Sequence, residues 1–240
     1  MKSNELTVGV LGGMGPDATI DFMSKVVALS SAKTDQDHIR MLVDHNPKVP
    51  NRQAAILEGG PDPGPELAAM ARRLEQAGAD FLVMACNSAH AFLEPVREAI
   101  TIPFVSIIEE SIGEIETHCP EAQKVGIMAT DGMLATGIYQ KQLSDTGRAA
   151  VVPREDELAR LMALIRRVKA GDRSPGVADE MGTLAELLAS AGAEAIIAAC
   201  TEIPLVLDAA RITVPVISST DVLARRTIAL ARGIAPLPQR

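Results

Sequence analysis

Short apolar runs rich in β-branched residues alternate along the chain with longer stretches in which apolar residues recur at helical spacing. In the amino-terminal half this pattern predicts strands at 7–11, 39–45, 80–86 and 102–107, and helices at 17–31 and 65–78. The strand runs are apolar at consecutive positions, so both faces of each strand would be covered. Such an alternation is typical of an α/β protein built on mainly parallel sheets.

The same alternation begins again in the second half of the chain. There the pattern predicts strands at 124–130, 149–153, 194–200 and 214–218, and helices at 156–171 and 181–192. Three segments match between the halves in the same order: AGADFLVMAC at 77–86 with AGAEAIIAAC at 191–200, ITIPFVS at 100–106 with ITVPVIS at 212–218, and TVGVLGG at 7–13 with KVGIMAT at 124–130. Their offsets of 114, 112 and 117 residues are nearly equal, which indicates an internal repeat.

The repeat predicts two homologous domains of Rossmann-like or flavodoxin-like architecture, related by a pseudo-two-fold axis. We assign residues 1–107 together with 217–240 to the first domain and residues 108–216 to the second. Ligands of open parallel sheets bind beyond the carboxyl ends of the strands. Two sets of strand ends that face each other would therefore place the active site in the cleft between the domains.

Cys86 and Cys200 occupy the same position in the two halves, at the carboxyl end of the third strand of each. Either residue alone would be interpreted as a small hydrophobic side chain, since free cysteine is among the most buried residue types. The equivalence of the two favours chemistry instead. Inversion of a stereocentre needs one group that removes a proton from one face and another that returns a proton to the opposite face. Thiols titrate close enough to neutrality to do both.

Polar side chains follow both cysteines and one further strand of the second half. A carbanion formed during inversion needs its negative charge spread into a carboxylate that hydrogen-bond donors hold. The donors that the sequence offers at these strand ends are Asn87, Ser88, Thr130 and Thr201.

Two titratable residues lie close to the cysteines in the sequence. His90 comes four residues after Cys86 and would either orient its thiolate or simply pack as a helix residue. Glu202 comes two residues after Cys200 and would either influence that thiol or serve as an ordinary first-turn acid, which a helix dipole favours.

Composition and charge narrow the classes of partner. The formal net charge of −8 and the pI near 5.1 disfavour nucleic acid and anionic membranes, which recruit clustered Lys and Arg. No apolar run approaches membrane-spanning length, and the amino terminus enters a strand without a signal-peptide pattern. Three cysteines are few and odd in number, which argues against a disulfide scaffold. We therefore expect a cytoplasmic protein that acts on a small molecule.

Cofactor and metal sites find little support in the sequence. One tyrosine and no tryptophan leave few rings to stack on a flavin or a nucleobase. The segment GGMGP at 12–16 aligns with a dinucleotide-binding pattern, but Asp44 lies further from the glycines than the usual spacing of about 20 residues. The glycines would rather let backbone approach a small ligand. The four histidines show no paired spacing with cysteine or carboxylate, so we expect no metal.

Six motifs occur along nearly the whole chain: LGGMGP at 11–16, HNPKVPNR at 45–52, MACNSAH at 84–90, MAT…LATGIY at 128–139, VKAG at 168–171 and ACTEIPL at 199–205. In these motifs and their order the chain resembles the cofactor-independent aspartate/glutamate racemase family, and more closely its aspartate-racemase branch. The resemblance implies two α/β domains with the site between them and no cofactor. It also implies a two-base mechanism in which Cys86 and Cys200 act as acid and base.

The resemblance implies substrate-binding residues as well. In the family, an arginine after the N-P-x-x-P turn and a lysine before the second cysteine hold the substrate carboxylates, and here these are Arg52 and Lys169. Met14 of the LGGMGP motif joins them at the substrate. Asn51 stands where the family often has aspartate and Ser88 where threonine is usual, and both departures bear on substrate preference. The family resemblance also favours a homodimer.

The sequence thus predicts racemisation of aspartate or glutamate without a cofactor. Alternatives on the same duplicated fold are a maleate-type isomerase, a decarboxylase and a hydantoin-type racemase. A non-catalytic two-domain ligand-binding protein is a further alternative, although paired cysteines speak against it. A Cys-His hydrolase with Cys86 as nucleophile would leave Cys200 without a role. Cys119 lies in a polar connection without a counterpart in the repeat, and we interpret it as incidental.

Overall fold

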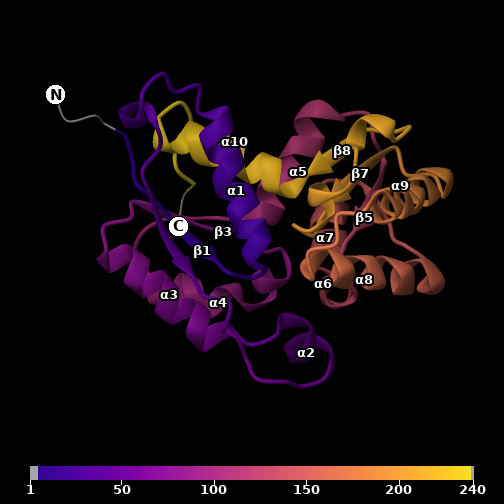
Figure 1. Cartoon of the computed structure of the whole chain (residues 1–240), viewed down its shortest axis with the longest axis horizontal. Helices are drawn as coiled ribbons and strands as arrows, with labels where there is room; N and C mark the ends of the chain where they lie inside the picture. The colour runs from indigo at the N-terminus through magenta and orange to yellow at the C-terminus, as the bar shows by residue number, and fades with distance from the viewer. Residues whose placement is uncertain (1–4, 239–240) are drawn as a thin grey trace.

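In the computed structural model, which describes residues 5–238, the chain forms two four-stranded parallel sheets (Figure 1). The first sheet has the order β2-β1-β3-β4 and contains β1 (Val8–Gly12), β2 (Met41–His45), β3 (Phe81–Met84) and β4 (Phe104–Val105). The second sheet has the order β6-β5-β7-β8 and contains β5 (Lys124–Met128), β6 (Ala149–Val151), β7 (Ala195–Ala198) and β8 (Val216–Ser218). The two orders are equivalent within each half, which confirms the predicted α/β fold with two parallel sheets.

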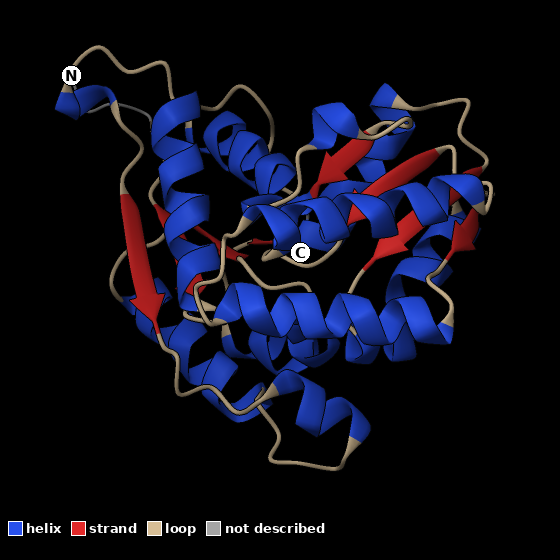
Figure 2. Ribbon diagram, turned by 45° about the vertical axis from the view of Figure 1, so that its right-hand side comes forward, coloured by secondary structure: helices blue, strands red, loops and turns tan. Residues whose placement is uncertain are grey.

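Helices flank both sheets (Figure 2). Within residues 5–238 the α-helices are α1 (Pro16–Leu29), α2 (Arg52–Leu57), α3 (Gly64–Gln76), α4 (Leu93–Ala99), α5 (Ile107–His118), α6 (Asp131–Thr136), α7 (Ile138–Asp145), α8 (Glu155–Lys169), α9 (Pro175–Ser190) and α10 (Ser219–Ala231). Short 3₁₀ helices are η1 (Asp35–Asp37), η2 (Ser88–Phe92), η3 (Ile203–Leu205) and η4 (Ala209–Arg211). The helix predicted at 181–192 begins at Pro175 in the structure. Proline is well tolerated in the first turn of a helix, so this residue does not prevent the earlier start.

The two central strand pairs have matching registers. β1 runs beside β3 with Val8 opposite Phe81, and β5 runs beside β7 with Val125 opposite Ala195. All residues of β3 and β7 are buried, as expected for strands covered on both faces. The predicted strand at 102–107 is shorter in the structure, because Ser106 already caps α5 and its side chain accepts a hydrogen bond from the Glu109 N–H at 3.3 Å.

Buried apolar side chains form three clusters. The largest is shared by the two halves and lies between the sheets, where it collects side chains of both sheets and of α1, α5, α7 and α10, including Val10, Phe22, Ile127, Tyr139 and Leu223. Figure 1 shows α1, α5 and α10 in this central position. A second cluster packs α3 and α4 on the first sheet, and a third packs α8 and α9 on the second. The two halves therefore share one continuous core.

The carboxyl-terminal helix α10 returns the chain to the first half. It packs against α1 and α5, and the Leu6 N–H donates to the Ala231 carbonyl at 2.8 Å just beside the start of β1. This packing joins the last helix to the first strand and helix. The domain boundaries predicted after residues 107 and 216 stay a prediction.

Candidate active site

Both cysteines lie just beyond the ends of equivalent strands. Cys86 follows β3 and Cys200 follows β7, each two residues after the strand, and each is 6% exposed. The alanine before each cysteine donates its backbone N–H to the neighbouring strand, Ala85 to Leu11 and Ala199 to Met128. The repeat thus places the two thiols by the same backbone arrangement.

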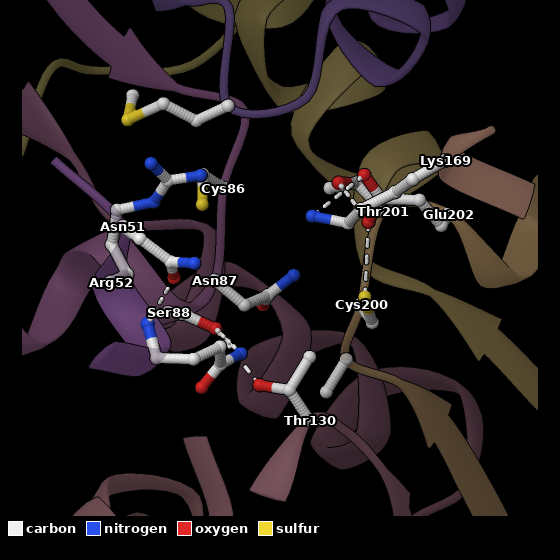
Figure 3. Close-up of a pocket in the computed structure, with 13 residues that line it drawn as sticks. Asn51, Arg52, Cys86, Asn87, Ser88, Thr130, Lys169, Cys200, Thr201 and Glu202 are labelled. Atoms are coloured by element: carbon white, nitrogen blue, oxygen red, sulfur yellow. Dashed lines mark hydrogen bonds and ion pairs between the residues drawn. The ribbon is translucent and has the colours of Figure 1, made fainter. Parts of the chain in front are cut away.

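One pocket, with an empty volume of about 360 Å³, lies between the two strand ends. Figure 3 shows the two thiols on opposite sides of it. The structure brings to this pocket all the residues to which the sequence assigned catalysis or substrate binding: Met14, Arg52, Cys86, Asn87, Ser88, Thr130, Lys169, Cys200 and Thr201. The rest of its lining consists of Asn51, Gln53, Ala199 and Glu202.

Glu202 connects the second thiol to the lysine. The Cys200 thiol donates to Glu202 Oε2 at 3.1 Å, and Glu202 Oε1 lies 3.4 Å from Lys169 Nζ (Figure 3). The Thr201 hydroxyl donates to the same Oε2 at 3.4 Å. Glu202 itself is only 3% exposed, so its carboxylate is held by these partners and not by bulk water.

The protonation states of this cluster follow from burial and charge. Burial, and then the Glu202 charge, raise the pKa of the Cys200 thiol well above its usual value, although Lys169 acts in the opposite direction. Burial alone would lower the pKa of Lys169, but the charge of Glu202, joined by those of the two cysteines when they ionise, outweighs burial and raises it. Lys169 is therefore a cation at neutral pH.

His90 lies behind Cys86 and outside the pocket. Its Nδ1 is 2.9 Å from the Cys86 carbonyl, and the Ile107 N–H donates to its Nε2 at 3.3 Å. Because Nε2 accepts, the ring must carry its proton on Nδ1 and donate it to the carbonyl. Burial lowers the pKa of His90 to about 4, so the ring is neutral at pH 7. The residue holds the backbone of Cys86 and makes no hydrogen bond to the thiol.

Arg52 is held at the start of α2. Asn51 caps this helix, its side chain accepting from the backbone N–H groups of Gln53 and Ala54. Arg52 Nη1 donates to the carbonyls of Val49 at 3.2 Å and Pro50 at 3.0 Å. The buried Nε of Arg52 has no hydrogen-bond partner within residues 5–238. The guanidinium is thus fixed on one edge and retains donors for a ligand.

Ser88 and Thr130 form a pair of hydroxyls contributed by the two halves. Their oxygens lie 3.0 Å apart, Gln53 Nε2 donates to Ser88 at 3.4 Å, and the Met133 N–H donates to Thr130 at 3.3 Å. The two hydroxyls carry two protons, and their mutual bond uses one of them. The other proton is available to a ligand in the pocket. Sequence reasoning missed Gln53, and its position directly after Arg52 was the signal.

Asn87 is the central residue of a buried network between the halves. Its Oδ1 accepts from the Tyr139 hydroxyl at 2.7 Å, and its Nδ2 donates to Ser219 Oγ at 3.1 Å. Ser219 in turn donates to the Ala198 carbonyl at 2.9 Å, at the end of β7. The side chain predicted to contact substrate therefore has partners on both amide atoms, although it still lines the pocket.

A wider depression that opens to solvent adjoins the pocket and shares Arg52, Lys169 and Glu202 with it. The glycine-rich loop after β1 forms part of its wall. Gly13 has a φ of +91°, and a Cβ there would lie 2.5 Å from the backbone of Asn46. This glycine is therefore required by a close approach of two protein backbones, which explains the residue without a dinucleotide.

Two other features, a metal site and a membrane-spanning helix, are absent from residues 5–238. No group of three or more His, Cys, Asp or Glu side chains in this range is arranged to hold a metal ion. In the same range, no helix has the length and apolar character needed to cross a bilayer.

Comparisons with protein families, single proteins and solved structures all find racemases. A model of the Asp/Glu/Hydantoin racemase family matches residues 11–227. The broad specificity amino-acid racemase RacX of Bacillus subtilis (strain 168) is 30% identical over 238 residues, which cover 92% of this chain and 96% of RacX. The structure of Picrophilus torridus aspartate racemase superposes with a TM-score of 0.82 at 28% identity and covers 94% of both chains.

A more distant structure shares the fold. Glutamate racemase isoform RacE1 from Bacillus anthracis has a TM-score of 0.63 at 20% identity, covering 97% of this chain and 84% of its own. The family model and RacX both span most of the chain, and they agree with the ordered motifs of the sequence. The chain therefore belongs to the Asp/Glu/Hydantoin racemase family, and it is an enzyme of the amino-acid racemase type.

Proposed function

We propose that this protein racemises an acidic amino acid, aspartate or glutamate, without a cofactor, and that Cys86 and Cys200 are its acid and base. The observation that supports this most directly is the position of the two thiols, which follow equivalent strands and face one pocket from opposite sides. A substrate bound between them would present one face of its α-carbon to each sulfur. That arrangement is the one that inversion requires.

The reaction would proceed in two proton transfers. A thiolate on one side removes the α-hydrogen, so the C–H bond breaks, an S–H bond forms, and the electron pair passes into the carboxylate. The thiol on the other side then gives its proton to the opposite face of the α-carbon, which forms a new C–H bond and leaves a thiolate. Positioned acid and base groups of this kind contribute roughly 10²- to 10⁴-fold in rate.

The charges around the pocket support an acidic substrate. Arg52 and Lys169 contribute two positive charges, whereas Glu202 and the thiolate that acts as base contribute one negative charge each. An acidic amino acid carries two carboxylates, one for each of the two cations. Arg52 would grip one carboxylate with its free guanidinium edge and Lys169 would pair with the other. The free proton of the Ser88–Thr130 pair would be donated to the carboxylate that takes up the carbanion charge, and Thr201 would add a second donor by exchanging its bond to Glu202 for the ligand.

The decisive experiment is a chiral chromatographic screen of the purified protein. Both enantiomers of aspartate, glutamate and several neutral amino acids would be incubated with protein dialysed against a chelator, with no cofactor added. We expect interconversion of aspartate or glutamate, and a matched Cys119→Ala variant should keep it because Cys119 lies outside the pocket. A protein that leaves every amino-acid enantiomer intact but decarboxylates or isomerises a dicarboxylic acid would overturn the proposal.

We further propose that the protein works as a homodimer in the cytoplasm. Exposed apolar side chains on one helix, Ile20 at 60% and Val27 at 47%, offer a surface for a second copy, and three unpaired cysteines suit a reducing compartment. Light scattering of the purified chain tests the dimer. A mass of one protomer over the micromolar range would contradict it.

A further inference from the structure

The two thiols are equivalent in the repeat, but the residues two positions further on are not. After Cys86 this position is Ser88, whose hydroxyl bonds to Thr130. After Cys200 it is Glu202, whose carboxylate accepts the thiol proton itself at 3.1 Å. Within residues 5–238, no hydrogen bond links the Cys86 thiol to another side chain. The pseudo-symmetry of the site is therefore broken at a group that interacts with only one of the two sulfurs.

We propose that Glu202 is a positioning residue that keeps Cys200 as a thiol in the resting enzyme, so that Cys86 is the base and Cys200 the acid when the first substrate binds. The inference rests on the proposed two-thiol racemisation and adds which thiol holds the proton at rest.

The geometry around Cys200 carries this assignment. A carboxylate acts only as an acceptor, so the hydrogen bond at 3.1 Å exists only while Cys200 is protonated. Ionisation of the thiol would replace the bond by two adjacent negative charges on residues that are only 6% and 3% exposed. Glu202 is rigid in this position, because it is 3% exposed and its other oxygen pairs with Lys169.

The other charged groups that face Cys200 do not reverse this effect. They are Lys169 from α8, Arg52 from α2 and, across the pocket, Cys86 after β3. Lys169 favours a Cys200 thiolate, but it also pairs with Glu202. The Gly15 backbone closes the remaining side, where an added Cβ would lie 3.0 Å from Glu202 Oε1. The net direction is a raised pKa of Cys200, due first to burial and then to Glu202.

The first test measures each thiol separately. The rate of alkylation by iodoacetamide would be followed from acidic to alkaline pH, with Cys86 and Cys200 quantified in their own peptides by mass spectrometry. In Glu202→Gln the midpoint of the Cys200 profile should fall by about one pH unit or more, the size of shift that an adjacent charge produces. Below the midpoint, the Cys200 rate should rise about threefold, because a tenfold gain in thiolate is partly offset by lower nucleophilicity.

Matched variants keep this test decisive. Glu155→Gln removes an exposed carboxylate from the start of α8 and should leave both profiles unchanged. Glu202→Asp keeps the charge and should restore most of the wild-type midpoint. Lys169→Met should move the Cys200 midpoint upward, opposite to Glu202→Gln, and it serves if the glutamine variant fails to fold. An unchanged Cys200 midpoint in folded Glu202→Gln, or a downward shift in Lys169→Met, would overturn the inference.

A second readout separates this inference from the proposed function. The alkaline limb of kcat/KM should move to lower pH in Glu202→Gln, whereas loss of a merely structural residue would lower kcat/KM without moving that limb. If no amino acid is racemised and the Cys200 midpoint still shifts, the racemase proposal fails, but the proposal that Glu202 keeps Cys200 protonated at rest is retained. If racemisation is present and the midpoint does not move, the role of Glu202 fails alone.

Discussion

Arg52 is fixed before any ligand arrives. Its Nη1 is bound by two carbonyls of the preceding turn, and its Nε is buried without a partner within residues 5–238. Lysine at this position would keep the positive charge but lose the planar fork. Replacing Arg52 by lysine therefore tests the geometry of the side chain separately from its charge.

We expect Arg52→Lys to raise KM for the acidic amino acid about tenfold, because it loses a bidentate contact worth roughly 1.4 kcal/mol. Steady-state kinetics in both directions would measure the change. The control is Arg72→Lys, an exchange at an exposed residue of α3, which should leave KM unaltered. A KM within twofold of wild type in Arg52→Lys would show that charge alone is sufficient.

A second prediction for single residues concerns the two thiols together. Cys86→Ala and Cys200→Ala should each lower racemisation at least about a hundredfold, since each removes one acid/base group. In deuterated water each variant should still exchange the α-hydrogen of one enantiomer, and the two variants should act on opposite enantiomers. Nuclear magnetic resonance of the α-position follows this exchange. Full racemisation by Cys200→Ala would rule out the two-base scheme.

Between elements, His90 joins the end of β3 to the start of α5. Its ring bridges the Cys86 carbonyl and the Ile107 N–H, and it is buried and neutral. In the unfolded chain the same imidazole would titrate near its ordinary pKa of about 6.5. Burial lowers that pKa to about 4 in the folded protein. Between these two values the unfolded state binds more protons, so the stabilising contribution is full above about pH 6.5 and is lost as the pH falls toward 4.

This linkage predicts how stability depends on pH. The free energy of unfolding should fall by roughly 3 kcal/mol from this residue between about pH 6.5 and 4. His90→Gln retains a donor and an acceptor but does not titrate, so its stability should vary less over the same range. Urea titrations at several pH values measure both slopes. His118→Gln, at an exposed histidine of α5, should keep the wild-type slope, and equal slopes in all three proteins would refute the assignment.

The sequence allowed the elements to be predicted wherever hydrophobic periodicity was strong. The central strands and the equivalent positions of Cys86 and Cys200 follow from buried runs that repeat between the halves. The periodicity gave no information about side chains that meet only in the folded chain. The hydrogen bonds of the Asn87 amide with Tyr139 and Ser219 depend on contacts across 52 and 132 residues, and Gln53 reaches Ser88 across 35.

The whole molecule is held together by the central cluster and by the network through Asn87. The cluster contains side chains of both sheets, and the network runs from Tyr139 in the second half through Asn87 to α10. Burial raises the pKa of Tyr139 strongly, so its hydroxyl stays protonated and donates at all physiological pH values. We therefore expect the two halves to unfold together in one cooperative transition.

Tyr139→Phe tests this coupling. Removing the hydroxyl leaves the buried Asn87 Oδ1 without its donor, which should cost about 1–3 kcal/mol of unfolding free energy while the transition stays single. Denaturant titrations monitored by circular dichroism give both quantities. Thr117→Ala removes an exposed hydroxyl that bonds only within α5 and should cost less than about 0.5 kcal/mol. Two separate transitions in the wild-type protein would contradict the shared core.

Helix α2, which carries Arg52 and Gln53, stands away from both sheets and contains no buried residue (Figure 1). Substitutions there alter the wall of the pocket while removing almost nothing from the core, so they escape the stability threshold that eliminates most changes elsewhere. The thiols directly follow fully buried strands, which tolerate little change. The residues that select the ligand therefore tolerate more substitutions than the residues that transfer the proton. Proteins with this fold can change the amino acid that they bind through substitutions in α2 while both cysteines stay in place.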